Sequence, residues 1–195
     1  MPLGAFKAAL MGTAGVSTGD VVLLSSQTAS DSATISFTSG ITSTYGEYIF
    51  RFYNINPEDS GVNFTFQANA AGGSGYDETM TTTWFKANHH EDDSAAALAY
   101  IAGNDQAQGT AFQVLRSSMG TAADESGAGE LHLFNPASTT YVKHFYSRMS
   151  GQQDSPTIVD EYIAGYINTT TAIDDIQFKM SNDNFNGVIK MWGVK

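Results

Sequence analysis

Residues 173–195, IDDIQFKMSNDNFNGVIKMWGVK, form the stretch that decides the expected fold. Ile176, Phe178 and Met180 alternate with polar residues, and this period of two places the apolar side chains on one face of a β-strand. A second alternating segment follows the dipeptide Asn186-Gly187, which favours a two-residue type I′ turn because that turn needs positive φ at both central residues. The stretch therefore predicts a terminal β-hairpin.

A turn at Asn186-Gly187 also fixes a register in which Asn182 faces Met191. The turn chemistry and the hydrophobic pattern agree in this register, because it gathers the apolar side chains on one side. A longer loop from Asn182 to Asn186 is an alternative. The face that we expect to be buried carries Phe178, Met180, Ile189 and Met191.

Short apolar or alternating segments recur along the rest of the chain, separated by turns rich in Gly, Pro, Asn and Ser. With the hairpin they make about nine or ten short strands, the spacing of an all-β sandwich. We therefore predict an all-β fold, a jelly-roll-like antiparallel β-sandwich. The strands expected before the hairpin are 21–24, 33–38, 48–53, 63–67, 81–86, 130–134, 141–148 and 160–168.

The middle of the chain differs in character. Residues 94–102 (SAAALAYIA) are Ala-rich and follow acidic residues that could cap a helix, and Ser94 is itself a candidate N-cap. Residues 108–119 carry Phe112 and Leu115 at helical spacing. We therefore expect one or two short helical turns in this excursion.

Composition limits the classes of partner. The chain has 195 residues, a formal net charge of −11 and no cysteine, so disulfides, thiolate metal sites and a cysteine nucleophile are excluded. An acidic chain is a poor match for nucleic acid, which requires basic patches. Because no apolar run approaches the roughly 20 residues that span a bilayer, we expect neither nucleic acid nor a membrane as partner.

At this length we expect a single β-sandwich domain, residues 21–195, preceded by an N-terminal arm, residues 1–20. The arm is punctuated by glycine, and Phe6, Leu10 and Met11 are its candidate anchors on a neighbouring subunit or on the domain surface. Their burial would contribute on the order of a few kcal/mol. A signal peptide is disfavoured because no charge precedes Lys7 and the apolar run after it is short.

Two clusters resemble metal sites, and neither has convincing ligand spacing. The run from His89 to Asp93 (HHEDD) places adjacent histidines on opposite sides of an extended chain, so we expect a solvated loop that caps the following helix. Residues 181–187 (SNDNFNG) are rich in oxygen ligands, but they lack the later bidentate Glu of a calcium loop and match ordinary turn chemistry. We expect no metal and no cofactor.

The sequence contains no GxSxG, P-loop, GxGxxG or HExxH motif. Acidic pairs occur at Asp174-Asp175 and Glu58-Asp59, where turns or strand starts favour solvated carboxylates. We therefore expect no catalytic residues and a non-enzymatic protein. A glycan-processing enzyme is a third, weaker class that would need two carboxylates converging in a cleft.

Five aromatic residues on the predicted strands are the strongest indication of binding. Their side chains could lie in the core or in a subunit interface, where Tyr and Trp are enriched. They could instead form a platform on which sugars stack. The candidates are Tyr53, Tyr146, Tyr162, Tyr166 and Trp192.

Residues 21–57 (VVLLSSQTASDSATISFTSGITSTYGEYIFRFYNINP) and 174–195 (DDIQFKMSNDNFNGVIKMWGVK) resemble a group of small virion structural proteins of tailed bacteriophages, especially marine ones. The resemblance spans roughly Val21 to Lys195 and rests on strand motifs. The early motif has Thr44-Tyr45, Tyr48, Phe50, Phe52 and Pro57. The late motif has Ile176, Phe178, Ser181, Gly187, Ile189, Lys190 and Gly193.

The resemblance implies a β-sandwich subunit of the virion, made in the host cytoplasm, with no catalytic residues to carry over. The expected function is that of a capsid decoration (cement) protein, which often forms a homotrimer and would bind the major capsid protein or other virion proteins. The alternative is a tail or head fibre-associated protein that binds host-surface glycan through an aromatic face.

Overall fold

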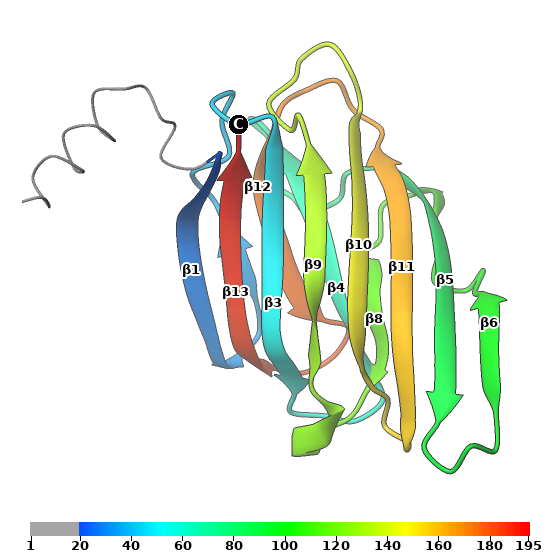
Figure 1. Ribbon diagram of the computed structural model, residues 1–195. Coiled ribbons are helices and arrows are strands. Elements are labelled where there is room, and N and C mark those ends of the chain that lie inside the picture. Colours follow the sequence, from blue (N-terminus) through cyan, green and yellow to red (C-terminus); the bar gives the residue numbers. More distant parts are fainter. Residues whose placement is uncertain (1–19) are drawn as a thin grey trace, which may run out of the picture.

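The computed structural model describes residues 20–195, which form mainly β-strands (Figure 1). Residues 1–19, with the candidate anchors Phe6, Leu10 and Met11, lie outside the described residues. A 3₁₀ turn, η1 (Ala123–Glu125), is the one helical element in the described range. The strands are β1 (Val21–Ser32), β2 (Ile35–Phe37), β3 (Glu47–Pro57), β4 (Val62–Ala70), β5 (Met80–His90), β6 (Ala96–Tyr100), β7 (Ala107–Gly109), β8 (Gln113–Met119), β9 (Gly127–Phe134), β10 (Lys143–Gln152), β11 (Thr157–Ile167), β12 (Ile173–Met180) and β13 (Phe185–Val194).

The strands form two antiparallel sheets that enclose one core. The large sheet has nine strands in the order β1-β13-β3-β9-β10-β11-β5-β6, with β7 also paired to β5. The small sheet has the order β2-β12-β4-β8 and lies behind the large sheet in Figure 1. This architecture confirms the predicted all-β antiparallel sandwich.

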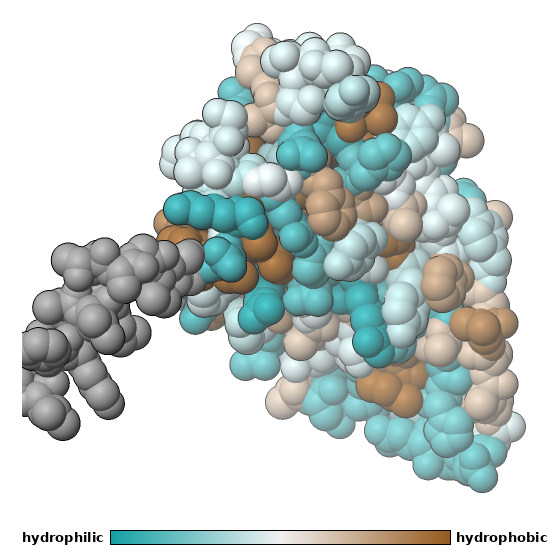
Figure 2. All heavy atoms as spheres, turned by 45° about the horizontal axis from the view of Figure 1, so that its top comes forward, coloured by the Kyte–Doolittle hydropathy of each residue, from teal (hydrophilic) through white to brown (hydrophobic). Residues whose placement is uncertain are grey.

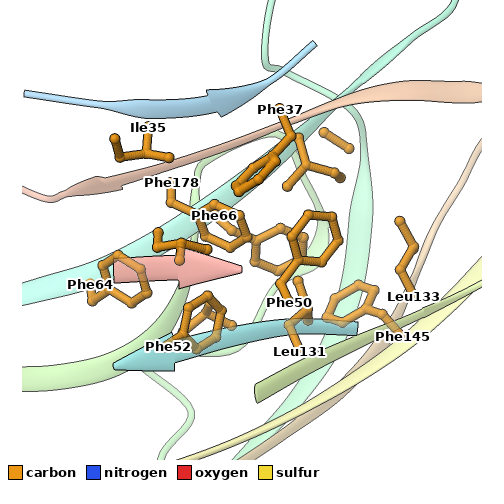
Figure 3. Packing of buried hydrophobic residues seen from close by; sticks show 14 of the residues in the cluster. Ile35, Phe37, Phe50, Phe52, Phe64, Phe66, Leu131, Leu133, Phe145 and Phe178 are labelled. Carbon is orange, nitrogen blue, oxygen red and sulfur yellow. The ribbon is translucent and has the colours of Figure 1, made fainter. Parts of the chain in front are cut away.

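Phe178 of β12 lies at the centre of the core between the sheets (Figure 3). Its ring packs against five other phenylalanine rings at centroid separations of 5.2 to 6.4 Å. Phe50 and Phe52 come from β3 of the large sheet, whereas Phe64 and Phe66 come from β4 of the small sheet. Aromatic pairs of this kind contribute about 0.5–1.5 kcal/mol each beyond area burial. The alternation of β12 therefore joins the two sheets through Phe178.

The predicted terminal hairpin is wrong, because its two strands lie in different sheets. β12 pairs with β2 and β4, whereas β13 pairs with β1 and β3. The predicted apolar faces are correct, since Phe178, Met180, Ile189 and Met191 are all buried. These side chains meet across the core from opposite sheets, and a period of two looks the same whether two strands pair laterally or face each other.

Gly187 lies in a β-bulge of β13 and not in a hairpin turn. Asn186-Gly187 lies inside β13, where the register with β3 shifts, and Gly187 has a φ of 140°. A Cβ atom at this position would lie 2.8 Å from Cδ1 of Ile55 and 3.0 Å from the carbonyl oxygen of Asn54. Only glycine allows β3 to approach this closely.

The predicted helical segments in the middle of the chain are also wrong. The Ala-rich segment forms β6 at one edge of the large sheet, and the second segment contains β8 at an edge of the small sheet. In β8 every second residue is buried, namely Gln113, Leu115, Ser117 and Met119, so the helical spacing of Phe112 and Leu115 is incidental. Tertiary packing overrides the local helix propensity here. A short helical turn does occur in this part of the chain, as predicted, but it is η1 at Ala123–Glu125.

A buried ion pair also joins the two sheets. Arg116 of β8 and Glu161 of β11 have fully buried side chains, with Nη1 and Oε1 3.2 Å apart. The backbone N–H of Ser117 donates to Oε2 of Glu161 at 3.0 Å, and the Ser117 hydroxyl donates to Oε1 at 2.7 Å. Burial raises the pKa of the Glu161 carboxyl and lowers the pKa of the Arg116 guanidinium. No pattern in the sequence predicted this pair.

Candidate binding face on the large sheet

The outer surface of the large sheet, which faces the viewer in Figure 1, carries all five candidate aromatic residues. Side chains alternate along each strand, and Tyr53, Tyr146, Tyr162, Tyr166 and Trp192 occupy the outward positions of β3, β10, β11 and β13. Tyr53 and Tyr146 are exposed, and their three companions are half-buried. The structure therefore brings the five together on one side of one sheet.

A row of outward side chains crosses this surface at one level of the sheet. Its first part, over β13, β3, β9 and β10, is charged, with acidic and basic groups side by side. Its second part, over β11, β5 and β6, is aromatic. Following the strand register from β13 to β6, the row contains Lys190, Arg51, Glu130, Arg148, Tyr162, Phe85 and Tyr100.

Both faces of the Tyr162 ring are covered by neighbours. The Phe85 ring stacks on it from β5, with centroids 5.0 Å apart and planes 5° from parallel. The guanidinium carbon of Arg148 lies 5.1 Å from the Tyr162 centroid. Because β11 lies between β10 and β5, Arg148 and Phe85 approach from opposite sides. A ligand can therefore reach only the edge and the hydroxyl of this ring.

Arg148 is fixed by Asp160. Its Nε donates to Oδ1 at 3.0 Å and its Nη2 donates to Oδ2 at 2.6 Å, while the Tyr162 hydroxyl also donates to Oδ2 at 2.9 Å. The hydrogen bond from Arg148 lowers the pKa of the Asp160 carboxyl, and the bond to Asp160 raises the pKa of Tyr162. Bidentate pairing defines the guanidinium plane, so the charged part of the row is preorganised.

His132 lies between two carboxylates on the same surface. Its Nδ1 is 2.5 Å from Oε1 of Glu47, and its Nε2 is 3.1 Å from Oε1 of Glu130 without the alignment of a hydrogen bond. The imidazole stacks on Tyr146 at a centroid separation of 4.5 Å. A glycosidase needs its carboxylates to face an open space that admits substrate. The imidazole fills the space between Glu47 and Glu130, so these residues do not form such a site.

Two hollows lie on this surface. One, of 410 Å³, is bounded by Arg51, Tyr53 and Arg148, and the other, of 420 Å³, is bounded by Tyr146 and Tyr166 among others. Both arginines of the first hollow are already paired, at 3.5 Å with Glu130 and at 2.6 Å with Asp160. The first hollow therefore offers a ligand no unpaired arginine.

Exposed apolar side chains gather at the β6 end of the surface. Leu98 and Tyr100 expose 74% and 55% of their area, and Ile158 of β11 exposes 46%. Across β5, Ile158 lies level with Ala96, two residues along β6 from Leu98, and all three exposed side chains are on the outer surface of the sheet. β6 (AALAY) has no charge, proline or bulge, which are the usual protections of an edge strand. We define the contact face as Tyr146, Arg148, Ile158, Tyr162, Phe85, Leu98 and Tyr100.

The histidine cluster lies at the end of β5 and in the turn that leads to β6. His89 Nε2 is 3.1 Å from Asp93 Oδ1, and Asp92 accepts a hydrogen bond from the Ser94 backbone N–H at 3.0 Å. Hydrogen bonds from the side chain and the backbone of Ser94 lower the pKa of Asp92. The Asp92 bond closes a turn between strands, so the expected helix cap is wrong. Within residues 20–195, no group of three His, Cys, Asp or Glu side chains could hold a metal ion.

Residues 181–184 connect the two sheets, and their amides engage nearby carboxylates. Asn182 donates to Asp59 at 3.4 Å, and Asn184 donates to Asp31 at 2.9 Å. Asn186, at the start of β13, donates to Glu58. The acidic pair Glu58-Asp59 therefore ties this connection to the end of β3. Of the other pair, Asp175 accepts a hydrogen bond from Asn69 at 3.4 Å.

Several members of the contact face were not predicted from the sequence. Phe85 and Arg148 sit at outward positions of predicted strands, so their alternation could have identified them as surface residues. Leu98 and Tyr100 fell in a segment that was predicted to be helical. Their proximity to Tyr162 depends on the strand order, which no local pattern reports.

Comparison of the chain with protein-family models, curated proteins and solved structures gives no match. Residues 20–195 also contain no helix long and apolar enough to cross a membrane.

Proposed function

We propose that the protein is a non-enzymatic structural subunit of a bacteriophage virion, a capsid decoration protein that binds and stabilises the shell. Its partners would be further copies of itself, in a homotrimer, and the major capsid protein or other virion proteins. The sequence resemblance supplies the virion setting. The contact face supplies the physical support for a protein that works by binding other proteins.

The observation that carries the proposal is the residue composition of the contact face, together with the covering of both faces of the Tyr162 ring. The contact face combines Tyr and Arg, which protein interfaces favour, with exposed Leu and Ile. The faces of Tyr162 are already occupied by Phe85 and Arg148. A sugar platform needs open ring faces, whereas a protein interface can use ring edges, hydroxyls and aliphatic side chains. This arrangement favours a protein partner.

The size of the surface is also adequate. Eight strands lie in sequence across the large sheet, and a spacing of about 4.8 Å makes the sheet roughly 34 Å wide. With strands of about eight residues, the outer surface covers roughly 900 Å². A standard protein interface buries about 800 Å² on each partner. One side of this sheet can therefore supply a complete interface.

Electron microscopy of phage particles released from infected cells that produce this chain tests the proposal. An antibody raised against the purified protein, bound to gold, should label the capsid surface in a regular pattern. Label on the tail or head fibres would instead support the fibre-associated alternative. The absence of label from particles, with the protein found only in the infected cell, would overturn the virion assignment.

A further inference from the structure

A separate hollow lies at the end of the sandwich where the β2–β3 and β9–β10 connections meet. Its volume is 370 Å³, and it is lined by Ser43, Tyr45, Gly46, Asn135, Ala137, Ser138 and Tyr141. Figure 2 turns this end of the molecule toward the viewer, with hydrophilic residues over much of it and apolar residues in separate patches. None of the contact-face residues lines this hollow.

Backbone hydrogen bonds join the two connections before any ligand arrives. The N–H of Asn135 donates to the carbonyl oxygen of Gly46 at 2.7 Å, and the N–H of Gly46 donates to that of Val194 at 3.1 Å. Asn135 has a φ of 45°, a left-handed conformation that Asn tolerates well. The Ser138 hydroxyl accepts the N–H of Tyr141 at 3.2 Å. The hollow is therefore preorganised.

The Tyr45 ring is also fixed. It packs edge-to-face on the buried Tyr48 ring at a centroid separation of 5.9 Å. A Cβ atom on Gly193 would lie 2.6 Å from the Tyr45 ring, so this ring rests directly on the β13 backbone. The Tyr45 ring therefore has a fixed position in one wall of the hollow.

Four polar side chains around the hollow lack hydrogen-bond partners within residues 20–195. The Asn135 carboxamide and the hydroxyls of Ser43, Tyr45 and Tyr141 form no hydrogen bond there. The Tyr141 side chain is exposed and stacks on no other ring in the described range, in contrast to Tyr162. The lining contains no Asp, Glu, Lys, Arg or His, although the whole chain has a net charge of −11.

We propose that this hollow binds a neutral sugar unit, with the apolar side of the sugar ring on Tyr141 and its hydroxyls on Asn135, Ser43 and Tyr45. A carboxamide and a hydroxyl each donate and accept, which matches the dual character of sugar hydroxyls. A Tyr ring presents an apolar surface beside a polar tip. An acidic sugar would find no cation in the lining. This activity is additional to the proposed role in the virion and uses another surface.

The test applies the full-length protein to an array of neutral hexose and N-acetylhexosamine oligosaccharides, with sialylated and uronic acid-containing glycans on the same array. Three variants are compared with the wild type. Tyr141→Ala removes the exposed ring, and Asn135→Gly removes the carboxamide while keeping a residue that accepts positive φ. Tyr53→Ala removes an exposed ring from the outer surface of the large sheet and serves as the matched control.

The wild type should bind at least one neutral glycan and no acidic one. Tyr141→Ala and Asn135→Gly should each weaken that binding roughly tenfold or more, and Tyr53→Ala should change it less than about twofold. Circular dichroism confirms that each variant is folded. Failure of the wild type to bind any neutral glycan would overturn the proposal. Binding that survives both loop variants, or that is lost only in Tyr53→Ala, would do so as well.

Discussion

The substitution Glu161→Gln should reduce the free energy of unfolding by about 3–5 kcal/mol, although it preserves the shape of the side chain. The carboxylate lies 3.2 Å from Nη1 of Arg116 and accepts two hydrogen bonds from Ser117, at 3.0 and 2.7 Å. A glutamine would turn an NH₂ group toward one of these donors. It would also remove the carboxylate that contacts the buried Arg116 guanidinium, and losing one partner of a buried pair is strongly destabilising.

The preceding residue provides a matched control. Asp160 lies next to Glu161 on β11 and also pairs with an arginine, but it points outward, and the Arg148 side chain is 62% exposed. Exposed ion pairs typically contribute about 0–1 kcal/mol. Asp160→Asn should therefore cost no more than about 1 kcal/mol.

Urea denaturation of the three proteins at neutral pH, followed by tryptophan fluorescence and far-UV circular dichroism, measures both costs. The slope of unfolding free energy against urea should be unchanged, so that the midpoints report stability alone. Replacing both partners, by Arg116→Met with Glu161→Leu, should recover part of the loss, because it removes the unpaired charge but leaves the buried Ser117 N–H without its acceptor. Equal costs for Glu161→Gln and Asp160→Asn would refute the reasoning.

Gly187→Ala should destabilise the protein by about 1–3 kcal/mol, because Gly187 has a positive φ and β3 approaches it closely. The control is Gly103→Ala, whose Cβ would meet nothing within 4 Å. This control should change the free energy of unfolding by less than about 0.5 kcal/mol. Equal midpoints for these two variants in urea would contradict the bulge geometry. The pKa of Asp160, followed by its carboxyl carbon signal in NMR, should lie below the ordinary value and rise toward it in Arg148→Met. Because folding lowers this pKa, the ion pair of Asp160 and Arg148 stabilises the protein above about pH 4. This contribution is lost as pH falls through the pKa of Asp160 in the folded protein. An unshifted Asp160 pKa in the wild type would contradict a stabilising pair.

Alternation along single strands was readable from the sequence, and partner choice was not. The pattern around Phe178 and Met180 correctly indicates a buried strand face. It carries no information on whether Ile189 and Met191 lie beside that face or opposite it, because both arrangements bury the same side chains. Asn186-Gly187 indicated a hairpin turn between two paired strands. The glycine is instead required because β3 packs too close to Gly187 for a side chain, and this contact exists only in the folded sheet.

In the candidate site, too, the orientation of single side chains could be predicted from the sequence, whereas contacts between strands could not. Tyr146, Tyr162 and Trp192 could be assigned to outward positions from their own strands. The covering of Tyr162 by Phe85 and Arg148 depends on β11 lying between β10 and β5, which is a property of the topology. The buried pair of Arg116 and Glu161 was likewise hidden, since its partners lie 45 residues apart and meet across two sheets.

The mass of the purified full-length protein, measured by light scattering over a range of concentrations, tests the contact face most directly. The comparison is with the double variant Leu98→Asp, Tyr100→Asp and with the control Leu23→Asp, an exposed leucine on β1 at the opposite edge. We predict three times the chain mass of 20.8 kDa for the wild type and the control, and the mass of a single chain for the double variant. A wild-type monomer at every concentration, or an oligomer that the double variant leaves intact, would contradict assembly through the contact face.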